Sequence, residues 1–231
     1  YPYQYNGPLT DDGGRFDHLK GKISNNRPHG YRRDLVNAAA HIQWQADAFT
    51  LSSVSSYQWL TDDMRIDQDF LADDIFTLRQ RQRIHTLNQE LTLKSPTRQR
   101  WQWVTGLSGM LQWTRADAPV DFYTDGVAMI QQAMDEGMKD APVRVQLTDE
   151  HLHIPGLFHT PVRSIALFHQ SDIRLTERLT LTAGLRLDHE RQAIDYNTRT
   201  TVNTLFTGMG LVAQPGHKTV AYTGHFRKRQ T

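Results

Sequence analysis

The sequence predicts an all-β protein, an antiparallel transmembrane β-barrel segment with roughly eight strands of a larger barrel. Three observations predict it. Apolar and polar side chains alternate over long stretches, short and long connections alternate along the chain, and the five tryptophans fall near the ends of the predicted strands. Alternation with a period of two indicates a strand, because successive side chains of a strand point to opposite faces of the sheet.

The strand predictions differ in strength along the chain. In Leu179–Asp188, four leucines and an alanine alternate with threonine, glycine, arginine and aspartate. Trp101–Trp113 repeats the pattern, with tryptophan and leucine on one face and glutamine, glycine and serine on the other. A third copy runs from Phe49 to Trp59, although serines occupy two of its outward positions. Weaker candidate strands are Arg15–Ser24, Tyr31–Gln45, Ile84–Lys94, Arg163–Arg174 and Lys218–Phe226.

The connections between these segments are of two kinds. The tight links are Ala46–Asp47, Ser95–Arg100 and Thr176–Arg178. The long polar connections are Thr61–Arg83, Ala116–Val162 and Arg191–His217. Barrels of the bacterial outer membrane show this alternation, because their periplasmic turns are short and their extracellular loops are long.

One helix is expected inside the second long connection, between Gly126 and Lys139. Apolar side chains recur there at helical spacing, at Val127, Ile130, Met134 and Met138. This short extracellular helix would cover the mouth of the barrel or a neighbouring loop.

The composition excludes several classes of protein. With 26 Lys+Arg against 25 Asp+Glu, the chain has no electrostatic field that favours nucleic acid. The absence of cysteine removes disulfide scaffolds, thiolate metal sites and cysteine nucleophiles. No run approaches the ~18 apolar residues that a transmembrane helix needs, so strands must make any membrane crossing.

The tryptophans argue for a membrane barrel over a soluble β-sandwich, which also produces alternating strands. Trp44, Trp101 and Trp103 lie beside short turns, while Trp59 and Trp113 lie beside long connections. Indole rings at both ends suit the two water–lipid boundaries, so these five residues are the predicted membrane girdles. The steps from Trp101 to Trp113, at ~3.3 Å each and a tilt of ~45°, cover roughly 28 Å, close to the expected apolar band of ~25 Å.

Several segments resemble the barrels of TonB-dependent receptors. The most specific is a strand, turn and strand that runs through Ala166–Gln170 and Leu175–Asp188. Further segments similar to the family, in the family's order, are Phe49–Gln58, Asp67–Asp69, Asn88–Pro96 and Trp101–Leu107.

The resemblance implies active import of ferric siderophores or similar scarce nutrients across the bacterial outer membrane, energised by a TonB complex. It implies that residues 1–231 are part of the barrel domain, with the plug domain and the C-terminal strands absent. The implied partners are outer-membrane lipid, a ferric-siderophore or other small nutrient ligand, and the TonB complex through the missing plug. We expect no enzyme activity, no cofactor and no nucleic acid partner. The alternative function is a soluble or small closed β-protein that binds a ligand or a protein partner.

The candidate ligand contacts lie in the long connections. Three histidines of the second connection, His151, His153 and His159, have spacings that would allow one shared metal ion, but a solvated loop is the favoured interpretation. Tyr123 is included because binding pockets need aromatic side chains. The remaining candidates, Arg79, Arg81 and Arg83, alternate on one face. They would either line a lumen and meet an anionic ligand or pair with neighbouring carboxylates.

The first long connection is acidic. Its carboxylates are Asp62, Asp63, Asp67, Asp69, Asp73 and Asp74. The Asp67-x-Asp69 spacing suggests a calcium site, but the glycine and the distal glutamate of an EF-hand loop are missing. A solvated loop is therefore the favoured interpretation. Motifs for hydrolases, zinc proteases and phosphate-binding loops are absent from the sequence.

Overall fold

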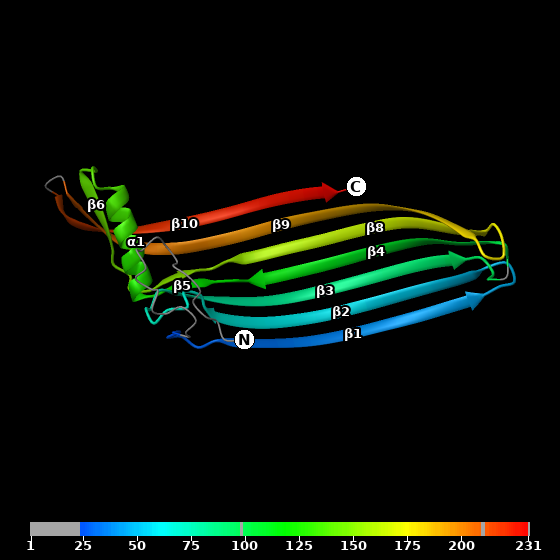
Figure 1. Ribbon diagram of the computed structural model, residues 1–231. Coiled ribbons are helices and arrows are strands. Elements are labelled where there is room, and N and C mark those ends of the chain that lie inside the picture. The colour runs from blue at the N-terminus through cyan, green and yellow to red at the C-terminus, as the bar shows by residue number, and fades with distance from the viewer. Residues whose placement is uncertain (1–23, 98, 209–210, 231) are drawn as a thin grey trace.

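Seven long strands form one antiparallel sheet in the computed structural model, which describes residues 24–97, 99–208 and 211–230 (Figure 1). They lie side by side in chain order, β1-β2-β3-β4-β8-β9-β10. Their bounds are β1 Gly30–Gln45, β2 Thr50–Asp67, β3 Phe76–Lys94, β4 Trp101–Asp117, β8 Leu157–Arg174, β9 Thr180–Gly208 and β10 Leu211–Gln230. The sheet is open, because within the described residues β1 and β10 each pair on one side only.

The remaining elements come between β4 and β8 in the sequence, although β4 and β8 are direct neighbours in the sheet. They are the short strands β5 (Val120–Phe122), β6 (Val143–Leu147) and β7 (Leu152–Ile154) and the helix α1 (Thr124–Gly137). The expected helix is therefore confirmed. In the described part of the chain, no helix has the length and apolar character needed to cross a bilayer.

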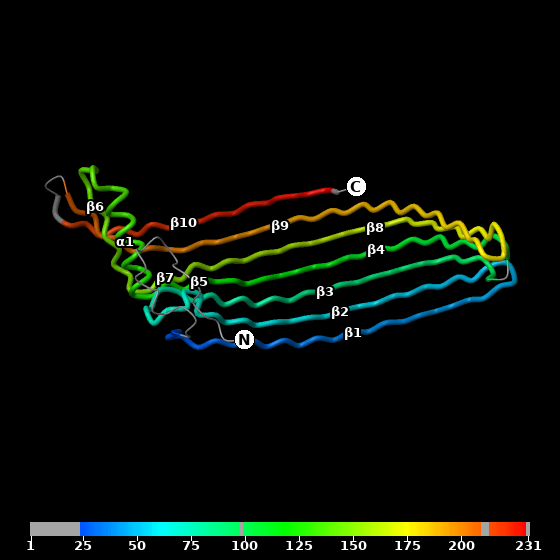
Figure 2. The backbone as a smooth tube through the Cα atoms, viewed as in Figure 1, coloured from blue at the N-terminus to red at the C-terminus, as the bar shows by residue number. Residues whose placement is uncertain are grey.

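The two ends of the sheet differ as the connections predict. The links β1–β2, β3–β4 and β8–β9 are tight and lie together at one end, here called the turn end (Figure 2). A hydrogen bond from the Ala46 N–H to the Phe49 carbonyl, 2.9 Å, closes the first link, and one of 2.9 Å from the Leu175 N–H to the Leu179 carbonyl closes the last. At the opposite end, here called the loop end, lie α1 and β5 (Figure 1).

The long connections are shorter than expected, because the strands continue into them. The predicted loop Arg191–His217 is wrong: β9 runs to Gly208 and β10 begins at Leu211. The first connection shrinks to residues 68–75 and the second to residues 118–156. The predicted strand Arg15–Ser24 falls almost entirely outside the described residues, and Ser24 itself is not in a strand. Beyond the membrane both faces of a strand can be polar, so the pairing continues where the alternation of hydrophobicity stops.

The register divides the side chains between two faces, because directly paired residues of antiparallel strands point the same way. One row across β3, β4, β8 and β9 consists of Leu91, Leu107, Leu167 and Leu187. We call this side the apolar face. The next row, on the opposite polar face, runs through Glu90, Ser108, Ala166 and Asp188. Each strand therefore presents hydrocarbon to one side and polar groups to the other.

The apolar face is uncovered. Leu107, Leu167 and Leu187 are 43%, 55% and 61% exposed. The buried apolar side chains among the described residues are few: Ile66, Leu71, Ile75, Val127, Leu152 and Ala166. A soluble sandwich would cover such leucines with a second sheet. The alternative of a soluble or small closed β-protein is therefore wrong, and the exposed face suits a wall in contact with lipid.

Within β3, the polar face is also the more enclosed one. Thr86 and Thr92 of this face are buried, whereas Leu87 and Leu91 of the apolar face are exposed. Side chains crowd together on the inside of a curved sheet and spread apart on the outside. The polar face is therefore concave and corresponds to the interior of a barrel.

The serines that interrupt the pattern on β2 share a partner on β3. The Gln89 Nε2 donates to Ser53 Oγ over 2.9 Å, and the Ser55 hydroxyl donates to Gln89 Oε1 over 2.5 Å. Hydrogen bonding lowers the cost of placing polar groups on a face that meets hydrocarbon.

The start of α1 packs against the first connection. The Asp125 N–H donates to the Asp74 carbonyl, 3.2 Å, and the Asp74 N–H donates to the Asp125 carboxylate, 2.7 Å. Gly126 is buried, and a Cβ built on it would lie 2.2 Å from the Ile75 carbonyl oxygen.

We expect Gly126→Ala to loosen this contact by about 1–3 kcal/mol, since the clash is with backbone. Hydrogen exchange of α1 should accelerate, while exchange in β4 stays unchanged. Gly137→Ala is the control, because nothing lies within 4 Å of its Cβ position. Equal exchange rates in the two variants would contradict the packing argument.

Candidate functional site

The three candidate arginines of β3 lie on the apolar face, beyond its leucines and toward the loop end. The Arg79 guanidinium binds Asp63 through two hydrogen bonds, of 2.9 Å and 2.5 Å. The Arg81 Nη2 donates to Asp117 Oδ2 over 2.7 Å. Pairing with carboxylates therefore describes Arg79 and Arg81. A lumenal position is wrong for this strand, because the register places all three arginines on the outward face.

The three candidate histidines do not come together. His151 Nε2 and His153 Nδ1 lie 3.0 Å and 2.7 Å from one oxygen, Asp121 Oδ1. His159 instead faces Asp195, with Nδ1 3.6 Å from Oδ2. Among the described residues, no group of three or more ligating side chains could hold a metal ion. The hypothesis of one ion shared by the three imidazoles is therefore wrong.

Tyr123 completes the group around Asp121 at the loop end. Its ring stacks on that of His151, with centroids 5.1 Å apart, and the Arg27 guanidinium lies 3.7 Å from its centroid. A cavity of about 260 Å³ adjoins the group, lined by Arg27, Pro28, Arg65, Thr77, Arg79, Asp121 and Tyr123. Two predicted candidates, Arg79 and Tyr123, thus share a cavity, although their contact with a ligand stays a prediction.

The acidic first connection is a folded loop rather than the solvated one expected. Asp67 and Asp69 are 0% and 1% exposed. The Asp67 carboxylate accepts the N–H groups of Asn26 and Arg27 over 3.0 Å and 3.1 Å. The Asp69 carboxylate accepts two N–H groups of its own loop, those of Leu71 and Phe76, over 2.9 Å and 3.1 Å. Both carboxylates therefore act as caps for backbone donors.

The pKa values of two carboxyl groups in this loop are shifted in opposite directions. The Arg27 guanidinium, which donates to Asp74 over 2.7 Å and 2.5 Å, lowers the pKa of that carboxyl below its usual 3.8. Burial raises the pKa of Asp69 above 3.8, against the opposing effect of its backbone hydrogen bonds. The Asp74 contribution to stability is therefore present above the unfolded-state pKa and is lost as pH falls through the lower folded-state value.

We expect the protection factors of residues 68–75 against hydrogen exchange, each taken relative to an unfolded peptide at the same pH, to fall as the pH is lowered below about 4. In Asp74→Asn this acid-dependent loss of protection should largely disappear. Any remaining change in the stability of the loop should be a gain as the pH falls, because the raised pKa of Asp69 favours the folded loop at low pH. An unchanged acid response in Asp74→Asn would exclude the Arg27–Asp74 pair as its source.

The tryptophans form two levels on the apolar face. Trp59 and Trp113 both pair with His85 and so lie in one row toward the loop end. Near the turn end, the row that contains Trp44 is next to the row that contains Trp103. Trp101 lies one row closer to the turn end on β4. The levels match the predicted girdles, while contact of these rings with lipid remains a prediction.

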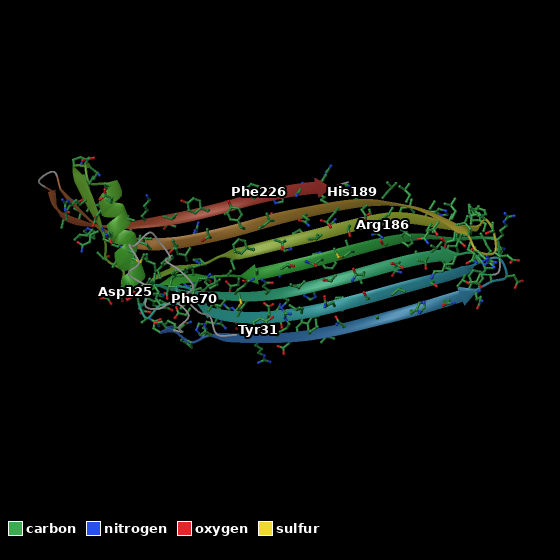
Figure 3. The ribbon with its side chains drawn as sticks, viewed as in Figure 1. Tyr31, Phe70, Asp125, Arg186, His189 and Phe226 are labelled. Atoms are coloured by element: carbon green, nitrogen blue, oxygen red, sulfur yellow. The ribbon has the colours of Figure 1, made fainter. Side chains whose placement is uncertain are left out.

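An aromatic cluster that the sequence did not predict lies on the polar face. Phe158 pairs with Tyr196, and Ile194 pairs with Phe226, all on the side of the sheet that carries Asp188. The rings of Tyr196 and Phe226 are stacked, with centroids 6.2 Å apart and planes inclined by 10°. Figure 3 shows Phe226 on β10, beyond Arg186 in the direction of the loop end. We call Phe158, Ile194, Tyr196 and Phe226 the lumenal aromatic cluster.

The cluster depends on a glycine. A Cβ on Gly224 would lie 2.2 Å from Tyr196 Cε1, so the tyrosine ring occupies the space that a side chain would fill. The cluster was not predicted from the sequence, because residues 191–217 were expected to form a loop. The detectable signal was Ile194 and Tyr196 at alternate positions, opposite a segment already predicted as a strand.

The chain matches the family described as TonB dependent receptor-like, beta-barrel, over residues 1–220. It belongs to this family. Members are outer-membrane proteins of Gram-negative bacteria, which places the chain in that membrane. An uncovered apolar face and long connections gathered at one end are the features expected of such a barrel, in which the long loops are extracellular. Among curated proteins none matches the chain.

One solved structure that the chain resembles is the ferric yersiniabactin uptake receptor FyuA from Yersinia pestis. The two are 12% identical in sequence, with a TM-score of 0.49. The alignment covers 91% of this chain and 27% of the FyuA chain, so the chain spans about a quarter of that receptor's length.

Proposed function

We propose that this TonB-dependent receptor barrel segment forms part of the wall and mouth of an active importer. Its substrates are ferric siderophores or similar scarce nutrient complexes, and a TonB complex supplies the energy. The TonB contact is made by a plug domain that lies outside this chain. The chain performs no catalytic step in this proposal.

The lumenal aromatic cluster carries the proposal. It lies on the concave polar face, on the loop-end side of the Trp59 and Trp113 row, in the part of the wall that a ligand entering from outside passes. The Phe226 ring is 63% exposed, so it is available for contact. Aromatic rings beside a few polar groups are typical of small-ligand sites, because they bury much ligand surface with little loss of side-chain entropy.

The experiment measures uptake of ⁵⁵Fe by cells whose outer membrane contains the whole receptor, with this segment and the plug domain. The probes are ferric catecholate, hydroxamate and phenolate siderophores, each supplied alone. We expect Tyr196→Ala/Phe226→Ala to lower uptake about tenfold, since each ring contributes roughly a kcal/mol or more to ligand contact. The amount of folded protein in the membrane should not change.

Leu157→Ala is the matched control, because Leu157 is next to Phe158 in β8 but lies on the apolar face. It should leave uptake unchanged. Equal uptake by the double variant and the unmodified protein would exclude the cluster as a ligand contact. A lack of uptake with all three kinds of probe would exclude ferric siderophores as the substrate class.

A further inference from the structure

Four neighbouring strands each place an arginine on the apolar face, just beyond the end of its leucine-rich part toward the loop end. These residues, here called the arginine belt, are Arg83 on β3, Arg115 on β4, Arg163 on β8 and Arg191 on β9. Each lies within four positions of an apolar residue of the same face, on its loop-end side: Leu87, Trp113, Ile165 and Leu187 respectively. Arg83 and Arg115 lie one row beyond the row of Trp59 and Trp113 toward the loop end, and Arg163 and Arg191 lie one row before it. The belt therefore lies on both sides of the tryptophan level, where the hydrocarbon surface gives way to headgroups.

The register sets like charges directly against each other within the belt. Arg83 pairs with Arg115, and Arg163 pairs with Arg191. Like charges directly opposite in a sheet repel and destabilise the pairing. The two pairs are displaced by four residues in register, and an anion bound from outside would offset the repulsion in each.

The protein does not supply that anion within its described residues. The belt arginines make no ion pair there, although Arg79 and Arg81 on the same face both do. Arg83 and Arg115 border a hollow of about 870 Å³ that also contains Trp59 and several carboxylates. Those carboxylates are engaged: Asp34 with Arg32, Asp62 with Arg33, Asp63 with Arg79, Asp117 with Arg81, and Asp195 with His225.

We infer that the arginine belt binds the phosphate groups of glycolipid headgroups in the outer leaflet. Guanidinium groups bind phosphate oxygens in pairs through parallel N–H donors, which makes arginine the preferred partner of phosphate. A lipid also explains the position of the belt, since acyl chains can lie against the leucines directly below it. A free anion would explain the arginines but not their position beside the tryptophan level, next to the leucines of the apolar face.

The test compares binding of diphosphoryl lipid A to the membrane protein purified in a nonionic detergent. Native mass spectrometry measures the bound lipid, and thermal unfolding measures the stabilisation it gives. We expect Arg83→Gln/Arg115→Gln, and separately Arg163→Gln/Arg191→Gln, to weaken binding by about tenfold or more. Without lipid, each variant should unfold at the same temperature as the unmodified protein or higher, because the repulsive pair is gone.

The control removes the same two charges elsewhere. Arg144→Gln/Arg186→Gln changes one arginine on β6 at the loop end and one on the polar face, and it should retain full lipid binding. Equal loss of binding in this control would overturn the inference, as would full binding by both belt variants. Equal binding of lipid A stripped of its phosphates would also overturn it. So would inorganic phosphate that alone gives the same stabilisation, since the site would then be a simple anion site.

Discussion

Replacing Leu107 by arginine is expected to prevent stable insertion of the protein into the outer membrane. Leu107 lies in the leucine row of the apolar face, between the two tryptophan levels of β4, and β4 pairs with a strand on each side. An arginine at the midplane of a barrel wall costs about 2–4 kcal/mol. Urea unfolding of the protein refolded into lipid vesicles should show this loss, with a lower yield of heat-modifiable protein on gels.

Ser108→Arg is the matched control, because Ser108 is the next residue of β4 and lies on the polar face. It should change the unfolding free energy by much less, since its side chain faces the aqueous interior. A larger loss in Ser108→Arg than in Leu107→Arg would reverse the assignment of the two faces. Membership of the family would not account for such a result, because in a membrane barrel the apolar face is the one that tolerates charge least.

Replacing Asp69 by alanine is expected to unfold the first extracellular connection without unfolding the sheet. The variant leaves two N–H groups, those of Leu71 and Phe76, without their acceptor. Each buried donor left unsatisfied costs about 1–3 kcal/mol, so the loop should lose roughly 2–6 kcal/mol. Limited proteolysis should then cut within residues 68–75, where the unmodified protein resists.

Asp73→Ala is the comparison for this experiment. It removes a neighbouring carboxylate that makes no hydrogen bond or ion pair with the described residues, so it should leave the protease resistance intact. Equal cleavage of the two variants would show that loss of negative charge, rather than loss of the backbone acceptor, loosens the loop. An uncut Asp69→Ala protein would contradict the capping role directly.

The strands within the membrane level could be predicted because lipid and water act on opposite faces. Leu179–Asp188 and Trp101–Trp113 alternate so regularly that their strands and faces both follow from the pattern. The extension of β9 to Gly208 could not be predicted in this way. Outside the membrane the hydrogen bonds between the strands continue, but neither face of the sheet has to be apolar. The sequence there no longer alternates between apolar and polar residues, so it does not indicate a strand.

The site residues were harder to predict, because their roles depend on partners distant in sequence. His151, His153 and His159 are close in sequence, yet two of them share Asp121 and the third faces Asp195. Arg79, Arg81 and Arg83 were correctly placed on one face. Which face that is follows only from the register of β3 with β2 and β4.

The sequence by itself determined the class of fold, the positions of the turns, the helix and the family. These features depend on local patterns, such as the period of hydrophobicity and the order of turn residues. Such patterns can be read directly from the amino-acid sequence. Only the tertiary structure decided which arginines are paired, which carboxylates are buried, and that Tyr196 and Phe226 stack. Those features arise when strands pair over sequence separations that differ from one strand to the next. The paired neighbours then determine which charges meet and how deeply each side chain is buried.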